Sequence, residues 1–226
     1  REISIIFAAS CTVETSPVWS IRLASATLRK ISGSMSASGN VMRLAAEELD
    51  AAAQVTIIDS ENLSTGIGLL VLEAAIMAEQ GHTAAEITAA VRKLIPKVRA
   101  SFVVDTLVYL WRGGRCNAVA ALAGSALRLH PKIVVENGAM RATKKYRGKI
   151  DNVIMAYVKD MEADLKAARP ERVFITHSGC NREVVEEVRS YLKGLDVFCE
   201  ILETRAGGVI SSHCGPGTLG VLFIAK

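Results

Sequence analysis

The sequence predicts an α/β protein made of two α/β domains. Half of its 226 residues are hydrophobic but only 5% are aromatic, so its apolar content is mostly Ala, Val, Ile and Leu. That composition favours helices packed on buried strands. Short strand-like runs alternate with longer helical patterns, and the length suits one large or two small domains. We place a boundary near residue 100, giving domains at 1–99 and 100–226.

The first strands are expected at 3–7 and 55–58, where short apolar runs occur. Asp59-Ser60 ends the second strand. A long helix is predicted from 66 to 80, because Gly81 suits the position that follows a helix end.

A second helix is expected to begin after Thr83, which has Glu86 three residues later. This pair forms the pattern of a capping box. The helix is predicted to end near Leu94, because Pro96 follows shortly after it. The order of strand, helix and helix indicates a parallel sheet in this region.

The second region is predicted to open with a strand at 101–104. Asp105 is expected to cap a short helix that runs through Trp111 and stops at Gly113-Gly114. A Gly-Gly pair of this kind is typical of an ordinary helix end flanked by solvated arginines. The alternative is that Arg115 supplies a charge that holds a loop or meets an acidic partner.

Asn137-Gly138 predicts a β-hairpin between strands at 132–136 and 139–143. Asn-Gly between two such runs is the strongest short-range hairpin signal. A helix is expected next, from 149 to 168.

The chain is predicted to close with a strand, a helix and a strand at 172–176, 181–193 and 197–202. A loop at 211–217 and a last strand at 219–225 complete the expected order of elements.

Composition excludes several classes of protein. The net charge is only +4 and the basic residues do not run in blocks, so nucleic-acid binding is not indicated. Five cysteines without a Cys-x-x-Cys pair favour free thiols in a reducing cytoplasm. No apolar stretch reaches about 18 residues, so we expect no membrane span. The first residues are too short and acidic for a signal peptide, and without an initiator Met the N-terminal part is expected to be shortened or gapped.

The segment 31–39, ISGSMSASG, has four serines and two glycines directly before a helical pattern at 41–49. Hydroxyls and free backbone N–H groups at a helix start favour an anion. An ordinary N-cap loop is the competing interpretation.

The segment 211–217, SSHCGPG, could also hold an anion. Gly-Pro-Gly fixes an unusual backbone path and permits close approach of a ligand. His213 could hydrogen-bond a carboxylate, or it could only satisfy loop carbonyls.

Two other chemistries are weakly indicated. His177 and Cys180 with His213 and Cys214 could be imagined as zinc ligands, but their spacing is poor. Ser36 with His213 could form part of a hydrolase, yet no Gly-x-Ser-x-Gly elbow surrounds any serine. No P-loop or dinucleotide fingerprint is present. We therefore expect no metal and no cofactor.

An ordered series of segments resembles the DegV family from residue 31 to the end. ISGSMSAS at 31–38 is similar to the family's I-S-S-x-L-S-G-T loop, and IDSENLSTGIG at 58–68 to its next signature. VDTLVYLWRGGR at 104–115 resembles the very specific D-T-L-x-Y-L-x-x-G-G-R segment. Pro131, Asn137-Gly138 and Lys145-x-Arg147-Gly148 fit the hairpin that follows. HCGPGTLG at 213–220 resembles the closing H-x-G-P-G-x-x-G.

The resemblance implies two α/β domains with one long-chain fatty acid in a slot between them. It further implies a carrier that presents the acyl chain to a separate fatty acid kinase and is not itself an enzyme. By the same resemblance Ser36 and His213 bind the carboxylate, and Thr15 is the candidate for the family's head-group threonine, although Thr15-Ser16-Pro17 lacks the family's Gln. Ala37 and Ser38 stand where the family has Gly and Thr.

Further residues complete the expected site. The supporting positions are Ser32, Gly33, Gly215 and Gly217. Arg115 and Arg147 could dock a partner kinase, or they could be solvated. Two alternatives stay open: a serine-dependent acyl hydrolase, and an interaction domain without a ligand.

Overall fold

The computed structural model describes residues 4–8, 38–48, 55–114 and 129–226. The chain divides into two compact units. The first consists of residues 1–97 with 137–139, and the second of residues 98–136 with 140–226.

The first unit contains a parallel pair of strands, β1 (Ser4–Ala8) and β2 (Val55–Asp59). Helix α1 (Ser38–Glu48) contacts both strands. These elements confirm the predicted strands, the predicted helical pattern and the parallel pairing expected in this region.

Helices α2 (Thr65–Glu79) and α3 (Ala84–Leu94) pack on each other in the same unit. Gly81 has φ +84° and takes the left-handed conformation just past α2. Thr83 and Glu86 form the predicted capping box: the Glu86 N–H donates to Thr83 Oγ1 at 3.3 Å, and the Thr83 N–H to Glu86 Oε2 at 2.8 Å. A short 3-10 turn, η2 (Ile95–Lys97), follows.

The second unit is built on a six-stranded sheet of order β5-β4-β3-β8-β6-β7. Its strands are β3 (Val98–Val103), β4 (Leu129–Glu136), β5 (Ala139–Arg147), β6 (Ala168–Ser178), β7 (Glu200–Arg205) and β8 (Thr218–Ala225). The pairs β3/β4, β3/β8 and β6/β8 are antiparallel, and β6/β7 is parallel. The α/β fold class is therefore confirmed, with a sheet of mixed direction in this unit.

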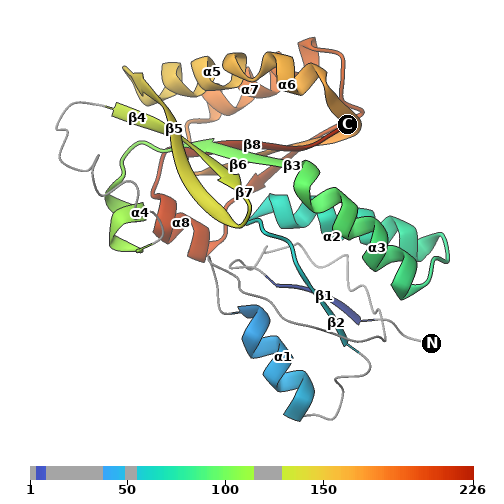
Figure 1. Cartoon of the computed structure of the whole chain (residues 1–226). Coiled ribbons are helices and arrows are strands. Elements are labelled where there is room, and N and C mark those ends of the chain that lie inside the picture. The colour runs from blue at the N-terminus through green and yellow to red at the C-terminus, as the bar shows by residue number, and fades with distance from the viewer. Residues whose placement is uncertain (1–3, 9–37, 49–54, 115–128) are drawn as a thin grey trace. The chain divides into compact units, whose positions relative to one another are not determined.

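Five helices accompany this sheet among the described residues. They are α4 (Val108–Arg112), α5 (Ile150–Asp160), α6 (Glu162–Lys166), α7 (Arg182–Gly194) and α8 (Gly208–Cys214). Helices α5, α6 and α7 cover one face of the sheet (Figure 1). Their buried side chains form one core with those of β6 and β8, including Ile154, Val188, Ile175 and Val221.

The β4–β5 hairpin turns at Asn137-Gly138, as predicted. Both residues have positive φ, 50° and 70°, which is typical of a type I′ turn. The sequence pattern found the turn because its backbone conformation is one that Asn and Gly tolerate best. Both strands are longer than predicted.

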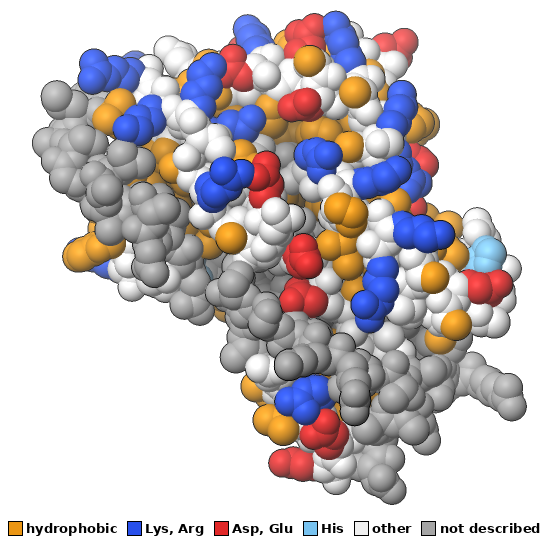
Figure 2. Space-filling view, viewed as in Figure 1, with side chains coloured by type: hydrophobic (Ala, Val, Ile, Leu, Met, Phe, Trp, Pro, Cys, Tyr) orange, Lys and Arg blue, Asp and Glu red, His pale blue; other side chains and the backbone are white. Residues whose placement is uncertain are grey.

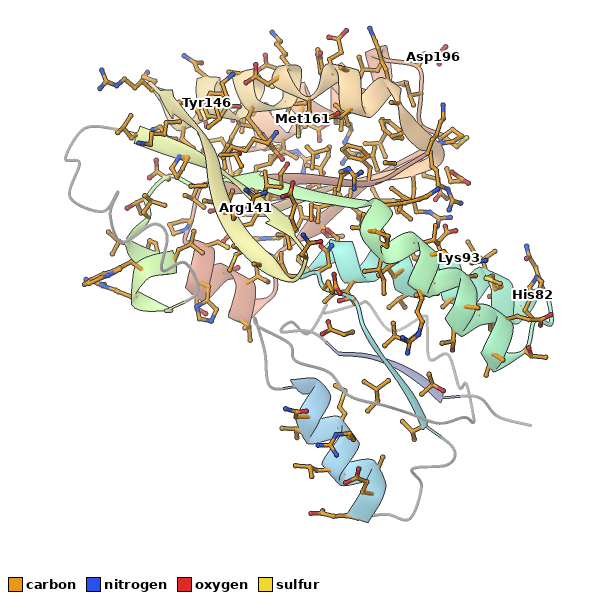
Figure 3. All side chains as sticks on the ribbon, viewed as in Figure 1. His82, Lys93, Arg141, Tyr146, Met161 and Asp196 are labelled. Atoms are coloured by element: carbon orange, nitrogen blue, oxygen red, sulfur yellow. The ribbon has the colours of Figure 1, made fainter. Side chains whose placement is uncertain are left out.

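The helix predicted at 149–168 is wrong in its length and continuity. It is two helices, interrupted at Met161, and strand β6 already begins at Ala168. Met161 has φ −95° and ψ 7°, and its N–H donates to Val158 O, three residues back, at 3.1 Å. Its buried side chain accepts a hydrogen bond from Ser101 Oγ at 3.3 Å, so tertiary packing overrides the helical pattern. Figure 3 shows Met161 in the layer between helices and sheet.

Two further elements differ from prediction. The strand expected at 197–202 lies at Glu200–Arg205, because its pairing with β6 begins where Arg172 meets Glu200 and Asp196 still turns with φ 53°. The loop expected at 211–217 begins as helix α8. The hydroxyls of Ser211 and Ser212 donate to Ala206 O and Val209 O at 2.9 and 2.8 Å.

The hydroxyl of Tyr157 joins the helix layer to the two central strands. It donates to Ser101 O of β3 at 2.7 Å and accepts from the Val221 N–H of β8 at 3.0 Å. Ser101 and Val221 are register partners, so the hydroxyl stands between two backbone groups of the β3–β8 ladder. Tyr157 is fully buried, and this burial raises its pKa.

We predict that Tyr157→Phe lowers the free energy of unfolding by roughly 1–3 kcal/mol, since both backbone groups lose a buried partner. Urea denaturation measures the change. Tyr191→Phe is the matched control, because its hydroxyl binds the more accessible Glu162 and water can replace it. Equal losses in the two variants would contradict the bridging role.

Candidate functional site

Helices α4 and α8 meet at one end of the two central strands, β3 and β8, because of the topology of the sheet. Strand β3 ends at Val103, and α4 follows it. Strand β8 begins at Thr218, directly after α8 and its closing turn. The two strands are antiparallel, with Val103 paired to Leu219, so the end of β3 and the start of β8 lie side by side. Figure 1 shows the two helices side by side there, and they are in contact.

The start of α4 corrects the predicted cap. The helix begins at Val108, with Leu107 and not Asp105 at the N-cap. The Val108 N–H instead donates to Thr106 Oγ1 at 3.3 Å. The Asp105 carboxylate is too early in the chain to reach the first turn, and it lies 3.5 Å from His130 Nδ1.

The end of α4 is where the Gly-Gly pair predicted it. The Gly113 N–H donates to Tyr109 O at 2.9 Å, and the Gly114 N–H to Trp111 O at 3.0 Å. Gly113 keeps a helical backbone, with φ −74° and ψ −6°, whereas Gly114 has φ +64°. The pair is therefore a helix end, and only Gly114 needs the left-handed conformation.

His213 lies in the last turn of α8. The helix stops at Gly215, which has φ +78°, and Gly217 has φ +74°. The Gly215 N–H donates to Ser211 O at 2.8 Å, and the Gly217 N–H to Ser178 O at 2.7 Å. Both glycines thus shape the backbone as predicted, but their own N–H groups are already engaged and cannot donate to a ligand.

The two helices approach each other through glycines. A Cβ atom on Gly113 would lie 2.1 Å from His213 Nδ1, and one on Gly215 would lie 2.3 Å from Tyr109 Cδ2. The His213 ring therefore lies against the backbone of α4, and the Tyr109 ring against the end of α8. Segments 104–115 and 213–220, far apart in the sequence, form one packed unit in the described residues.

His130 is a buried histidine that the sequence analysis missed. Its Nδ1 lies 3.3 Å from Val104 O, and its Nε2 lies 3.0 Å from Gly148 O. Only 4% of the residue is exposed. It ties the segment before α4 to the turn after β5. A single histidine at the start of a strand carries no spacing signal, so only the tertiary structure identifies it.

The imagined zinc set does not assemble in the described residues. His177 Nε2 lies 3.4 Å from Glu203 Oε1, and the Cys180 thiol donates to Thr218 O at 3.3 Å. Burial raises the pKa of Cys180 to about 12, which keeps the thiol protonated. Across the described ranges, no three His, Cys, Asp or Glu side chains come together as metal ligands.

Strand β5 carries a row of basic side chains at the edge of the sheet. Arg141 pairs with Glu136, and Lys144 pairs with Asp160, whose pKa this hydrogen bond lowers. Lys145 and Arg147 are exposed and pair with no carboxylate in the part of the chain that the structure describes. Figure 2 shows Lys and Arg side chains among acidic ones on the face that β5 crosses.

Several predicted site residues lie outside the described residues. They are Thr15, Ser32, Gly33, Ser36 and Arg115. The structure thus places His213, Gly215 and Gly217 together and Arg147 on β5. Within the same described ranges, no helix is long and apolar enough to span a bilayer.

Comparison with known proteins decides the family. A family model described as an uncharacterised protein of the DegV family matches residues 29–226. The chain belongs to the DegV family. A DegV domain-containing protein of Caldanaerobacter subterraneus is 31% identical over 175 residues, which cover 76% of this chain and 61% of that protein. This DegV chain therefore spans about three fifths of that relative's length.

Solved structures share the DegV fold. A DegV family protein from Thermus thermophilus, described for its fatty acid binding, is 29% identical with a TM-score of 0.76, covering 87% of this chain and 69% of that one. The fatty acid kinase B3 protein of Streptococcus pneumoniae, loaded with linoleic acid, is 19% identical with a TM-score of 0.74, covering 87% and 70%. At that identity the second likeness concerns the fold alone.

We predict that His130→Ala destabilises the protein by at least about 1 kcal/mol, because it removes a buried ring and the hydrogen bond that its N–H makes to Val104 O or Gly148 O. Thermal and urea unfolding measure it. His82→Ala serves as the control, since that ring is exposed and only approaches Glu86 at 3.8 Å. A His130 variant as stable as the His82 variant would remove His130 from this structural role.

Proposed function

We propose that this DegV protein binds one long-chain fatty acid by its carboxylate and carries it to a partner. The observation that carries the proposal is the likeness, at 29% identity, to the Thermus thermophilus protein described for fatty acid binding. The packed unit of α4 and α8 supports it, because His213 there lies in the last turn of a helix and is half-buried.

The physical requirements of such a ligand fit the proposed residues. Burial of the acyl tail contributes about 0.8 kcal/mol per CH2 group, so an apolar slot can supply most of the affinity. The carboxylate must be hydrogen-bonded, or its burial would cost too much. In the proposal Ser36 and Thr15 donate hydroxyl hydrogen bonds, with Ser32 and Gly33 shaping the loop beside them. His213 donates from its ring.

The hydrolase alternative has less support. A serine hydrolase needs a base that is oriented by an acid. No described carboxylate hydrogen-bonds to His213, whose ring lies against Gly113. The geometry therefore favours binding over nucleophilic catalysis. The interaction domain without ligand is separated by the experiment below.

Native mass spectrometry tests the carrier function. We expect the purified protein to show the added mass of one fatty acid, and delipidated protein to rebind palmitate or oleate. Ser36→Ala should weaken rebinding by about tenfold, the worth of one charge-assisted hydrogen bond, without unfolding the protein. Ser190→Ala, exposed on α7, is the control. Absence of any acyl adduct would refute the carrier, and unchanged affinity in Ser36→Ala would remove Ser36 from the head-group site.

We further propose that the partner is a fatty acid kinase, to which the protein presents the carboxylate. The support is the shared fold with the Streptococcus pneumoniae kinase B3 protein. The exposed Lys145 and Arg147 on β5 offer positive charge for an acidic partner surface. Arg115, which lies outside the described residues, is the other basic residue that we propose for docking this partner.

Arg147→Glu should lower the rate of acyl phosphate formation with an added fatty acid kinase and ATP at least about tenfold, because like charges then oppose docking. Palmitate affinity should stay unchanged. Arg182→Glu is the control, an exposed arginine on α7 whose side chain is 87% exposed. A normal rate in Arg147→Glu would exclude this surface, and a matching loss in Arg182→Glu would show a nonspecific charge effect.

A further inference from the structure

We propose that Gly113 is a positioning residue for His213. Its missing side chain leaves the space that the His213 ring occupies, and so sets where that ring points for the fatty acid carboxylate. The inference rests on the proposed function, because the role of His213 at the head group belongs to it.

The backbone does not explain a glycine at position 113. Its φ of −74° and ψ of −6° are ordinary helical values that any residue adopts. Alanine is also a better helix former than glycine. The neighbouring Gly114 is the opposite case: its φ of +64° favours glycine, and an added Cβ would meet nothing within 4 Å.

The space beside position 113 explains why a glycine stands there. A Cβ on Gly113 would lie 2.1 Å from Nδ1, 2.8 Å from Cε1 and 3.3 Å from Cγ of His213. Cβ atoms essentially never come within 3.0 Å of a heavy atom of a residue that is not adjacent in the chain, so something must move. All three of these nearest atoms belong to the same imidazole ring, so the conflict concerns His213 alone.

Between the backbone of α8 and the His213 ring, the ring is the part that can move. The backbone of α8 is held at its end, where the Thr218 hydroxyl donates to Cys214 O at 3.0 Å and Gly215 packs on the Tyr109 ring. The imidazole instead turns about two side-chain bonds, the first between staggered positions and the second over a broad range. A methyl group at position 113 therefore displaces the ring and leaves the two helices in place.

The first measurement follows the ring directly. The chain has four histidines, so ring resonances in a nitrogen-15 NMR spectrum are few, and His213→Ala identifies those of His213. Gly113→Ala should shift the His213 resonances and leave the other three in place. Gly208→Ala is the matched control: it lies at the start of α8, with no atom within 4 Å of an added Cβ. Unmoved His213 resonances in Gly113→Ala would overturn the inference.

The second measurement is palmitate affinity of delipidated protein, by calorimetry. Gly113→Ala should weaken binding by about tenfold, the effect of losing one hydrogen bond to a charged group. In a His213→Ala background the same substitution should have no further effect, since the ring it displaces is gone. Equal losses in both backgrounds would overturn the inference. Unfolding of Gly113→Ala only when His213 is present would support it, and unfolding in both backgrounds would overturn it.

The two proposals fail separately. If His213→Ala binds palmitate as tightly as the unchanged protein, the head-group role of His213 is wrong. The NMR shift in Gly113→Ala still decides whether Gly113 positions the ring. If His213→Ala weakens binding but Gly113→Ala does not, the carrier function stands and the positioning role falls.

Discussion

A single buried hydroxyl, on Tyr157, holds helix α5 to the two central strands of the six-stranded sheet. It stands between Ser101 O and the Val221 N–H, so it bonds to both β3 and β8 at the position where these two residues pair. A buried polar group is stabilising only when its partners are satisfied. Here the strand groups and the hydroxyl satisfy one another, and this reinforces the pairing that places β8 beside β3.

The position of β8 determines how helices α4 and α8 lie at this end of the central strands. Because β8 starts next to the end of β3, the helix before β8 must lie beside the helix after β3. The close approach of α4 and α8 is then possible only where side chains are missing. Gly113 and Gly215 provide those places, one beneath the ring of His213 and one against Tyr109. The DegV signatures at 104–115 and 213–220 thus act as one structure.

Local signals in the sequence predicted local structure well. The capping box of Thr83 and Glu86, the turn at Asn137-Gly138 and the helix end at Gly113-Gly114 each depend on residues within a few positions of one another. Where tertiary contacts decide, the prediction failed. Met161 leaves the helix because its side chain packs toward Ser101, and the serines of α8 satisfy backbone carbonyls inside a helix. The contact of Gly113 with His213 joins residues 100 positions apart, which no local pattern contains.

The edge position of β5 has a consequence for how molecules of this protein meet each other. An edge strand offers a row of backbone groups to which another chain can add, and long flat edges of this kind promote aggregation. On β5 the exposed Lys145 and Arg147 would bring like charges together if two such edges approached. Like charges placed directly opposite one another across paired strands are destabilising. Lys145 and Arg147 therefore disfavour the pairing of two β5 edges.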